Sequence, residues 1–330
     1  MHIIKGGLLD TVQDGGRRGF QHLGINVGGV MDRFSAALAN ALLGKELTAP
    51  LLELHYPASV IQFSRETVIC LTGADFTPTI NEEPADLNQP MVVPKDSQLR
   101  FTGVREGSWC YLSMLGSLKL EPWLGSYSTN IRAEAGGFKG RKLKSGDVLP
   151  LVKELHLAPS LFNNSVHHLP WKAVGLHDLT RQEICILYGS EWNWLSAESR
   201  EALLHNCYYV SPASDRMGYQ LTGEPLKASN NEQMVSTGVT FGTVQLLPTG
   251  NLIVLMADGQ TTGGYPRVAH VVTAHLPALA QLKPHEGFRF CLADGAKAEL
   301  QLAEQQDYLL NLQKTCAAKM REWMGHGRRD

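Results

Sequence analysis

Neither sign of charge is in excess in this sequence. Its 330 residues include 30 lysines and arginines against 32 aspartates and glutamates, and the formal net charge is −2. Proteins that bind nucleic acids or anionic membranes normally carry a strongly basic surface. We therefore expect neither a nucleic acid nor a membrane among the partners of this protein.

Long apolar runs and paired cysteines are also lacking. The longest purely apolar run, residues 252–257, is far too short to span a bilayer, and the first residues do not follow the pattern of a signal peptide. No C-x-x-C pair is present, which argues against a cysteine-based zinc site or a disulfide framework. We expect reduced, mostly buried thiols in a cytoplasmic protein. The cysteines are Cys70, Cys110, Cys185, Cys207, Cys291 and Cys316.

Several motifs that hold phosphate, dinucleotide or metal are absent. No segment matches the P-loop, the Rossmann fingerprint, the G-x-S-x-G elbow or the H-E-x-x-H zinc motif. His270 and His275 are five residues apart, so a strand would point them to opposite faces. We expect no metal site.

The sequence is rich in turn-forming residues and short apolar segments. It contains 32 glycines and 16 prolines, and apolar or alternating stretches recur between them. This pattern indicates a mainly β protein with two barrels or sandwiches. The predicted strands are 59–63, 67–72, 91–93, 98–102, 109–114, 148–152, 184–188, 207–210, 242–246, 252–256, 270–273, 288–292 and 298–302.

A few helices are also predicted. Asp32 precedes an amphipathic stretch that Gly44 is placed to end, and Ser196 can cap a helix running to about His205. Pro277 is placed to open a short helix, and a narrow apolar stripe over 304–323 predicts a C-terminal one. The pattern breaks down between 155 and 175, which predicts an N-terminal domain over 1–160 and a C-terminal domain over 170–330.

The first polar, glycine-rich cluster spans residues 11–19. Glycines allow the backbone to approach a ligand, and Gln13, Asp14 and Arg17 offer an acceptor, a base and an anion clamp. The alternative is a hairpin turn at Asp14 with exposed arginines. Asp32 lies beyond this cluster, directly before the predicted amphipathic helix. Its position as the N-cap of that helix is already a sufficient structural explanation for this residue.

The second cluster, 258–267, follows a buried strand. A carboxylate, an amide, two hydroxyls and a phenol stand close together there, and this set suits a small amide or carboxylate substrate. A polar turn with a glycine bulge is the structural alternative. The candidate residues are Asp258, Gln260, Thr261, Thr262 and Tyr265.

The third cluster, 214–221, places Arg216 and Tyr219 on either side of a glycine. Arg216 can bind a carboxylate or phosphate, or it can bind loop carbonyls in a structural role. Both interpretations remain open on the sequence alone. Our working hypothesis is that the three clusters meet in one cleft that holds a planar amide.

Together these residues resemble the family of the 5-oxoprolinase C subunit, which is also described as allophanate hydrolase subunit 2 or biotin-dependent carboxyltransferase-like. The similarity extends over about residues 3–290. The chain departs from the family where Asp215 and Gln220 stand, since the family usually has Asn and commonly Arg there. The shared motifs lie at 11–17, 31–32, 39–40, 52–53, 71–74, 125–126, 128–129, 136–137, 140–141, 216–219, 242–245, 258 and 260–266.

The resemblance implies two β-barrel domains, at least one of them cyclophilin-like, and a place in an enzyme complex with the 5-oxoprolinase A and B subunits. The B and C subunits of such a complex activate the lactam of 5-oxoproline with ATP, and hydrolysis to glutamate is completed by the A subunit. Arg17 and Arg216 would neutralise phosphate or carboxylate, while Asp32, Asp258, Gln260 and Tyr265 would orient the ring amide. ATP would be shared with a partner subunit.

Two other functions fit the same residues. One is the carboxyltransferase part of a urea carboxylase, in which carboxybiotin donates CO₂ to an amide nitrogen; biotin would then come from another protein, because no Met-Lys-Met carrier sequence is present. The other is a non-catalytic regulator, whose polar clusters would form an interface with a partner that resembles either a kinase inhibitor or the B subunit.

Overall fold

The computed structural model describes residues 1–152, 165–174, 182–229 and 234–326, and the chain divides into two compact units. Unit 1 comprises 1–16, 32–176 and 306–330, and unit 2 comprises 17–31 and 177–305. This division differs from two consecutive domains because the segment 17–31 groups with unit 2 and the end of the chain groups with unit 1. The predicted boundary region, 155–175, lies largely outside the described residues.

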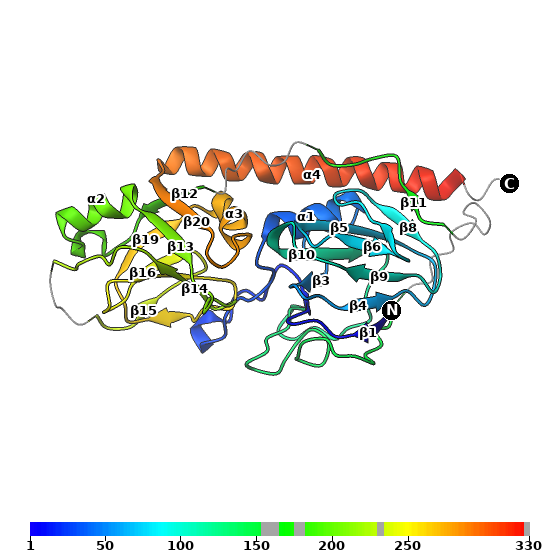
Figure 1. Cartoon of the computed structure of the whole chain (residues 1–330), viewed down its shortest axis with the longest axis horizontal. Helices are drawn as coiled ribbons and strands as arrows, with labels where there is room; N and C mark the ends of the chain where they lie inside the picture. Colours follow the sequence, from blue (N-terminus) through cyan, green and yellow to red (C-terminus); the bar gives the residue numbers. More distant parts are fainter. Residues whose placement is uncertain (153–164, 175–181, 230–233, 327–330) are drawn as a thin grey trace. The chain divides into compact units, whose positions relative to one another are not determined.

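Unit 1 is built from two β-sheets around an apolar core (Figure 1). Its strands are β1 (His2–Lys5), β2 (Thr11–Gln13), β3 (Leu51–Leu54), β4 (Val60–Gln62), β5 (Thr67–Asp75), β6 (Pro78–Ile80), β7 (Glu83–Pro84), β8 (Met91–Val93), β9 (Gln98–Phe101), β10 (Glu106–Met114) and β11 (His167–His168). The five-stranded sheet has the order β1-β4-β9-β6-β7, and the six-stranded sheet has the order β11-β8-β5-β10-β3-β2. Ile61 and Leu99 of the first sheet share one buried cluster with Leu71 and Leu112 of the second. The apolar face of each sheet is thereby removed from water.

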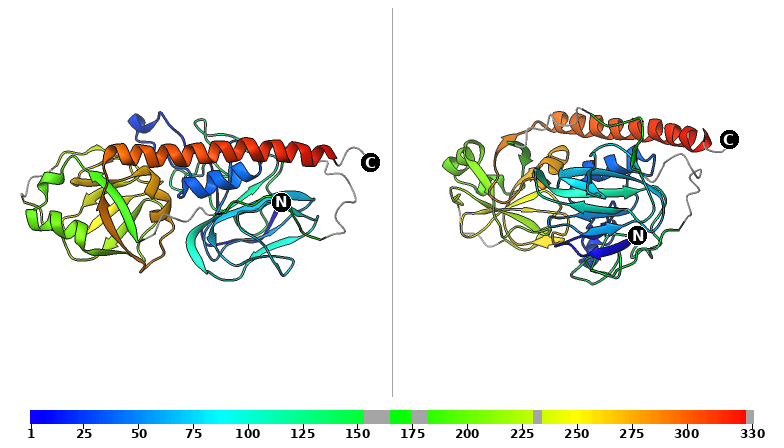
Figure 2. Two further views of the ribbon diagram at one scale, coloured as in Figure 1. Left: turned by 90° about the horizontal axis from the view of Figure 1, so that it is seen from above. Right: turned by 45° about the vertical axis from the view of Figure 1, so that its right-hand side comes forward.

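Two helices cover the other face of the six-stranded sheet. They are α1 (Arg33–Leu42) and the second part of α4 (Gly295–His326), which lie beside each other in both views of Figure 2. Leu38, Val68 and Leu309 belong to the buried cluster beneath them. Gly44 follows α1 with φ +66°, and a β-carbon there would lie 2.5 Å from Cα of Ala317. Only glycine allows this turn and this approach of the two helices.

Unit 2 is a closed β-barrel. Its strands are β12 (Glu183–Tyr188), β13 (Cys207–Val210), β14 (Gly218–Thr222), β16 (Thr243–Leu246), β17 (Leu252–Leu255), β19 (Arg267–Val271) and β20 (Gly287–Leu292). The order around the barrel is β12-β19-β16-β17-β14-β13-β20, and β12 closes it by pairing parallel with β20. Tyr208, Val254, Phe288 and Phe290 are buried, and the aromatic rings of Tyr208 and Phe290 contact each other.

Smaller elements complete unit 2. A two-stranded sheet pairs β15 (Thr237–Gly238) with β18 (Thr262–Gly263). The helical elements are α2 (Ala197–His205), α3 (Leu276–Ala280) and the 3-10 turns η1 (Gln21–Leu23), η2 (Trp192–Trp194) and η3 (Thr273–His275). Within the described residues, no helix is both long and apolar enough to cross a membrane.

The mainly β class is confirmed, and so are the caps that the sequence predicted. Asp32 accepts a hydrogen bond from Ser35 N at the start of α1, and Ser196 accepts one from Ser199 N at the start of α2. Two predicted strands are wrong. Residues 148–152 make only isolated bridges, and 298–302 lie inside α4, which begins earlier than the predicted C-terminal helix.

The prediction that all cysteines are reduced is also wrong. Cys185 and Cys291 form a disulfide. They stand directly opposite each other on the parallel strands β12 and β20, with Cα atoms 4.5 Å apart, which is within bonding reach. Their separation of 106 residues in sequence conceals this register.

Candidate functional site

A two-point ion pair between Arg216 and Asp258 is the centre of the candidate site in unit 2. Nε of Arg216 donates to Oδ2 of Asp258 at 2.7 Å, and Nη2 donates to Oδ1 at 3.1 Å. Nη2 also donates to the carbonyl of Gly29 at 2.6 Å. The Arg216 side chain is only 5% exposed, and that of Asp258 is 18% exposed. The planar guanidinium is therefore fixed in a single orientation.

Arg17 lies beside this ion pair. A β-carbon added at Gly28 would lie 3.1 Å from Nη1 of Arg17 and 3.6 Å from Oδ1 of Asp258, so both side chains lie close to Gly28. Arg17 is only 1% exposed, and its backbone N–H donates to Val27 O. The structure thus joins the first, second and third sequence clusters through Arg17, Asp258 and Arg216.

The pairing of β14 with β17 brings Arg216 and Asp258 together. Gly218 pairs with Leu255, so the residues just before β14 run beside those just after β17. Asp258 N donates to Arg216 O at 2.8 Å, and Met256 N donates to Met217 O at 3.0 Å. This backbone ladder fixes both side chains at one end of the barrel.

Asp215, at one of the two positions where the sequence analysis noted a departure, shapes the turn that precedes Arg216. Its Oδ1 accepts hydrogen bonds from the backbone N–H groups of Met217 and Gly218. An asparagine oxygen can accept the same bonds, so this departure preserves the local fold.

The charges of this cluster favour an anionic ligand. Arg17 and Arg216 are both buried, and their guanidinium N–H groups are hydrogen-bond donors. A carboxylate or phosphate group can accept N–H bonds from guanidinium groups and complements their charge. We call Arg17, Arg216 and Asp258 the arginine cluster.

The rest of the second sequence cluster is spread over other features of unit 2. Gln260 is exposed, and Thr261 O accepts a hydrogen bond from Val239 N. Thr262 belongs to β18. Tyr265 is 43% exposed and lines a groove of about 900 Å³ together with Trp194. Joint action of these side chains with the arginine cluster remains a prediction.

The buried side chain of Tyr219 makes a structural contact within unit 2. It is 4% exposed on β14, and its hydroxyl donates to Ala280 O at 2.9 Å, near the end of α3. This bond ties the barrel to α3. A substrate contact by Tyr219 remains a prediction.

The candidates Gln13 and Asp14 fall in unit 1. The Asp14 carboxylate accepts hydrogen bonds from Gly16 N, the Ser126 and Ser128 hydroxyls and Tyr127 N. Gln13 is fully buried, and its Nε2 donates to Thr11 Oγ1 and Thr129 O. The acceptor and base predicted here are therefore engaged in holding the loop that contains residues 126–129.

Asp32 also falls in unit 1, next to a pair of residues that sequence reasoning did not select. Its Oδ1 accepts from Ser35 N and its Oδ2 from the Ser35 hydroxyl. The backbone N–H of Asp32 donates to the Tyr111 hydroxyl, which itself donates to Glu53 Oε2 at 3.0 Å. Burial, reinforced by the charges of Glu53 and Asp32, raises the pKa of Tyr111 well above its ordinary value.

A signal for Glu53 was present in the sequence. It is the one charged residue of β3, a strand whose residues are all buried. A buried carboxylate must be hydrogen bonded, so such a residue indicates a polar network. Tyr111 occupies the register position opposite Glu53 on β10, and only the sheet pairing reveals this.

Among the described residues, no group of three or more His, Cys, Asp or Glu side chains is arranged to hold a metal ion. The donors of the arginine cluster are guanidinium groups, which bind anions and repel cations. This donor set fits the phosphate or carboxylate of a substrate or of ATP.

The sequence matches one family model over most of its length. The model is described as the carboxyltransferase domain, subdomain A and B, and it matches residues 23–292. The chain is 32% identical to the 5-oxoprolinase C subunit of Escherichia coli strain K12, over 94% of this chain and 97% of that protein. It is also 32% identical to the 5-oxoprolinase C subunit of Haemophilus influenzae, over 85% and 87%.

Among solved structures, the crystal structure of K. lactis urea amidolyase is similar to this fold. The TM-score is 0.83 at 25% identity, and the match covers 94% of this chain. It covers only 20% of the urea amidolyase chain. The same fold therefore occurs as one part of a much longer enzyme.

Proposed function

Because the chain belongs to the carboxyltransferase family of subdomains A and B, we propose that it is a subunit of an ATP-dependent 5-oxoprolinase complex. The observation that carries this proposal is the extent of the match to the E. coli 5-oxoprolinase C subunit, which reaches 97% of that protein. The proposed reaction is hydrolysis of the cyclic amide of 5-oxoproline to L-glutamate.

The chemistry requires activation of the lactam before water can open it. A lactam carbonyl is a poor electrophile, and transfer of a phosphoryl group from ATP to its oxygen, with release of ADP, makes the carbon reactive. One water then adds to this carbon and the ring carbon–nitrogen bond breaks, which gives γ-glutamyl phosphate. A second water hydrolyses this acyl phosphate to glutamate and phosphate. Positively charged donors held in place beforehand stabilise the charge that develops in such a transfer.

The arginine cluster is suited to hold the anionic part of the reactants. Arg17 and Arg216 would neutralise the carboxylate of 5-oxoproline or a phosphate of ATP, while Asp258 keeps the Arg216 guanidinium in one orientation. The exposed amide of Gln260 and the phenol of Tyr265 would contact the ring amide from the same loop. Asp32, Thr261 and Thr262 remain further candidates for this role.

Partner proteins are part of the proposal. The chain has no P-loop, so the phosphates of ATP would be held jointly with the B subunit. Ring opening would be completed by the A subunit. The protein would therefore act in the cytoplasm as part of a hetero-oligomer.

Carboxyl transfer to a urea-type amide is a second candidate function. The similarity to urea amidolyase, with a TM-score of 0.83, supports it. A guanidinium cluster can also bind the carboxylated product of such a transfer. In that reaction carboxybiotin, carried by another protein, would supply the CO₂.

A reconstitution assay distinguishes these functions. The chain is mixed with its candidate A and B partners, and glutamate release from 5-oxoproline is measured with and without ATP. We expect ATP-dependent glutamate release that requires all three proteins. Carboxyl transfer from carboxybiotin to urea, without glutamate release, would replace our proposal with the second function. Association with the B partner and no turnover of either substrate would indicate a regulator.

Substitution of an exposed residue tests the site without affecting the fold. Gln260→Ala should lower glutamate release because it removes a contact to the ring amide, while an exposed side chain contributes little to stability. Gln182→Ala is the matched control, since Gln182 is an exposed glutamine of the same unit that lies outside the three clusters. Equal activity of the two variants would remove Gln260 from the site.

A further inference from the structure

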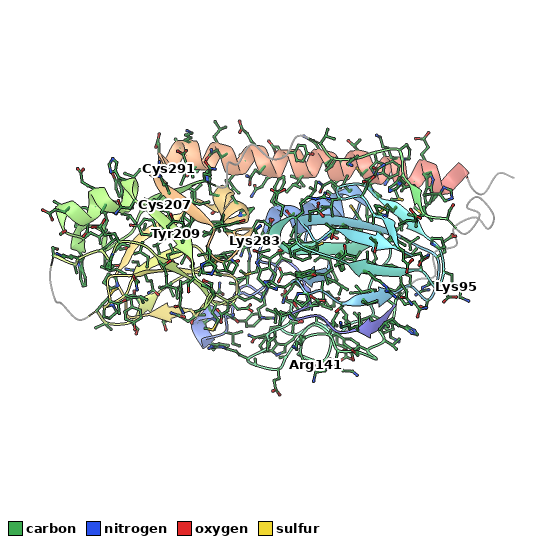
Figure 3. All side chains as sticks on the ribbon, viewed as in Figure 1. Lys95, Arg141, Cys207, Tyr209, Lys283 and Cys291 are labelled. Carbon is green, nitrogen blue, oxygen red and sulfur yellow. A yellow bond between two sulfur atoms is a disulfide. The ribbon has the colours of Figure 1, made fainter. Side chains whose placement is uncertain are left out.

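Three cysteines lie on the outer face of the unit 2 barrel, on three adjacent strands. Cys185 on β12 and Cys291 on β20 form the disulfide, and Cys207 lies on β13, the other neighbour of β20. Cys207 pairs with Arg289, two residues before Cys291, so both sulfurs point to the same side of the sheet. Figure 3 labels Cys207, Tyr209 and Cys291 on this part of the barrel. The face therefore carries one oxidised pair and one thiol.

Cys207 is the accessible thiol of this protein. The other free cysteines, Cys70, Cys110 and Cys316, are buried, whereas Cys207 is only partly buried. Burial raises the pKa of each of those three thiols, which keeps them protonated and unreactive. A small reagent that reacts with thiolates would therefore select Cys207.

The thiol lies in a cavity that carries both signs of charge. The cavity has a volume of about 520 Å³, which falls in the range of small-molecule sites, roughly 300–1,000 Å³. Glu183, Arg289 and Cys207 stand side by side in its wall, because the strands β12, β20 and β13 place them in one row. Glu183 and Arg289 are exposed. An ammonium group and a carboxylate group of one ligand can pair with them.

Gly287 makes room for the sulfur. A β-carbon at this position would lie 2.9 Å from Sγ of Cys207 and 2.8 Å from Cε1 of Tyr209. The hydrogen bond with Cys207 raises the pKa of Tyr209, so the phenol keeps its proton and donates to the sulfur. Gly287 therefore leaves space for both the sulfur and the Tyr209 ring.

We propose that Cys207 is a covalent modification site that forms a mixed disulfide with a small zwitterionic thiol. The Cys207 thiolate attacks one sulfur of the symmetrical disulfide of that thiol. A bond forms between Cys207 Sγ and this sulfur, the original sulfur–sulfur bond breaks, and the second thiol leaves as a thiolate. Arg289 binds the carboxylate of the attached thiol, and Glu183 binds its ammonium group.

The sheet geometry favours an external partner over Cys291. Residues diagonal to each other across two strands are about 7–8 Å apart, whereas a disulfide needs Cβ atoms within roughly 4.5 Å. Cys291 is already bonded to Cys185, its direct neighbour. Cys207 therefore reacts with a molecule that enters the cavity.

The test uses the full chain and oxidised glutathione, a zwitterionic disulfide. We expect one glutathionyl group per chain, located on the Cys207 peptide by mass spectrometry and removed by dithiothreitol. Cys207→Ser should abolish the adduct, and Cys316→Ser should leave it unchanged. Modification of another cysteine at an equal rate, or a bond between Cys207 and Cys291 without added glutathione, would overturn the proposal.

Two further measurements test recognition by the cavity. Arg289→Gln should slow glutathionylation about threefold, the factor expected for the loss of one exposed ion pair. The same substitution should not change the rate with the uncharged hydroxyethyl disulfide. Gly287→Ala should slow both reactions because its methyl group displaces the sulfur. Equal effects of Arg289→Gln on both disulfides would overturn the assignment to a zwitterionic ligand.

Discussion

Arg216 and Asp258 face each other in a two-point ion pair, with contacts of 2.7 and 3.1 Å. The residues are 42 positions apart in sequence and meet because β14 and β17 are neighbours in the barrel. Nη2 of Arg216 also holds the carbonyl of Gly29, in the segment 17–31. This single side chain thus links the barrel to the glycine-rich segment of unit 2.

We predict that breaking this pair strongly destabilises unit 2. Asp258→Asn leaves the guanidinium of Arg216, which is 5% exposed, without its counter-charge. The free energy of unfolding should fall by about 3 kcal/mol, as for other buried ion pairs that lose one partner. Urea denaturation followed by fluorescence measures this change.

A second ion pair provides the control. Arg105 contacts Asp75 at 2.8 Å, but its side chain is 74% exposed. Replacing Asp75 with Asn should therefore cost less than about 1 kcal/mol. Similar losses in Asp258→Asn and Asp75→Asn would show that burial of the Arg216 pair contributes nothing.

Asp10 should make stability depend on pH. Its carboxylate is fully buried in unit 1 and accepts hydrogen bonds from His55 N at 2.9 Å and Ser59 N at 2.6 Å. Burial raises its pKa from 3.8 to about 6. Between about pH 4 and pH 6 the folded state holds a proton that the unfolded chain has lost, so stability falls as the pH rises.

The measurement compares wild type with Asp10→Asn by urea denaturation at several pH values. A shift of about two pKa units corresponds to roughly 3 kcal/mol, so the advantage of wild type over Asp10→Asn should shrink by about that amount from about pH 3 to about pH 7. Asp96→Asn serves as a control because the Asp96 side chain is 65% exposed. A constant difference between wild type and Asp10→Asn would contradict the prediction.

Asp14 should act chiefly through the loop that it holds. Asp14→Ala leaves the donors of Ser126, Tyr127 and Ser128 without their common acceptor, and Ser126 and Ser128 are fully buried. We expect a loss of about 3 kcal/mol in the free energy of unfolding. Ser126→Ala removes one of these bonds and should cost about 1 kcal/mol. Thermal unfolding compares them; equal melting temperatures for Asp14→Ala and wild type would refute this role.

Local sequence patterns predict much of this fold because capping and alternation are local effects. The caps at Asp32 and Ser196 depend on neighbouring residues alone, as do the strands with clear apolar patterns. Ala298, Leu300 and Leu302 also alternate, yet they lie in α4, where Ala298 packs against Val272 and Ala274. Tertiary packing decides such ambiguous segments.

The sequence predicted which residues belong to the candidate site better than it predicted how those residues contact one another. Arg17, Arg216 and Asp258 were each selected as polar groups beside glycines, and the structure places them together. That Arg216 is directed at Asp258 depends on strand register, which residue type does not reveal. The Cys185–Cys291 disulfide was missed for the same reason.

Asp32 allows structural and catalytic roles to be separated experimentally. Both of its carboxylate oxygens accept hydrogen bonds from Ser35, so we expect its main role to be the cap of α1. Asp32→Ala should lower the free energy of unfolding by about 1 kcal/mol, whereas Asp32→Asn should change it by less than half of that, because Asn is an equally good cap. Urea denaturation measures both values.

Activity of the reconstituted complex then completes the comparison. If Asp32 only caps the helix, Asp32→Asn should release glutamate at close to the wild-type rate, since its fold and cap are preserved. A folded Asp32→Asn variant that releases no glutamate would show that the negative charge itself is needed, and would place Asp32 among the groups that act on the substrate. Ser35→Ala is the companion variant: it removes the hydroxyl bond to Oδ2 but keeps the backbone cap to Oδ1. It should therefore leave both stability and turnover nearly unchanged if capping through the backbone is what matters.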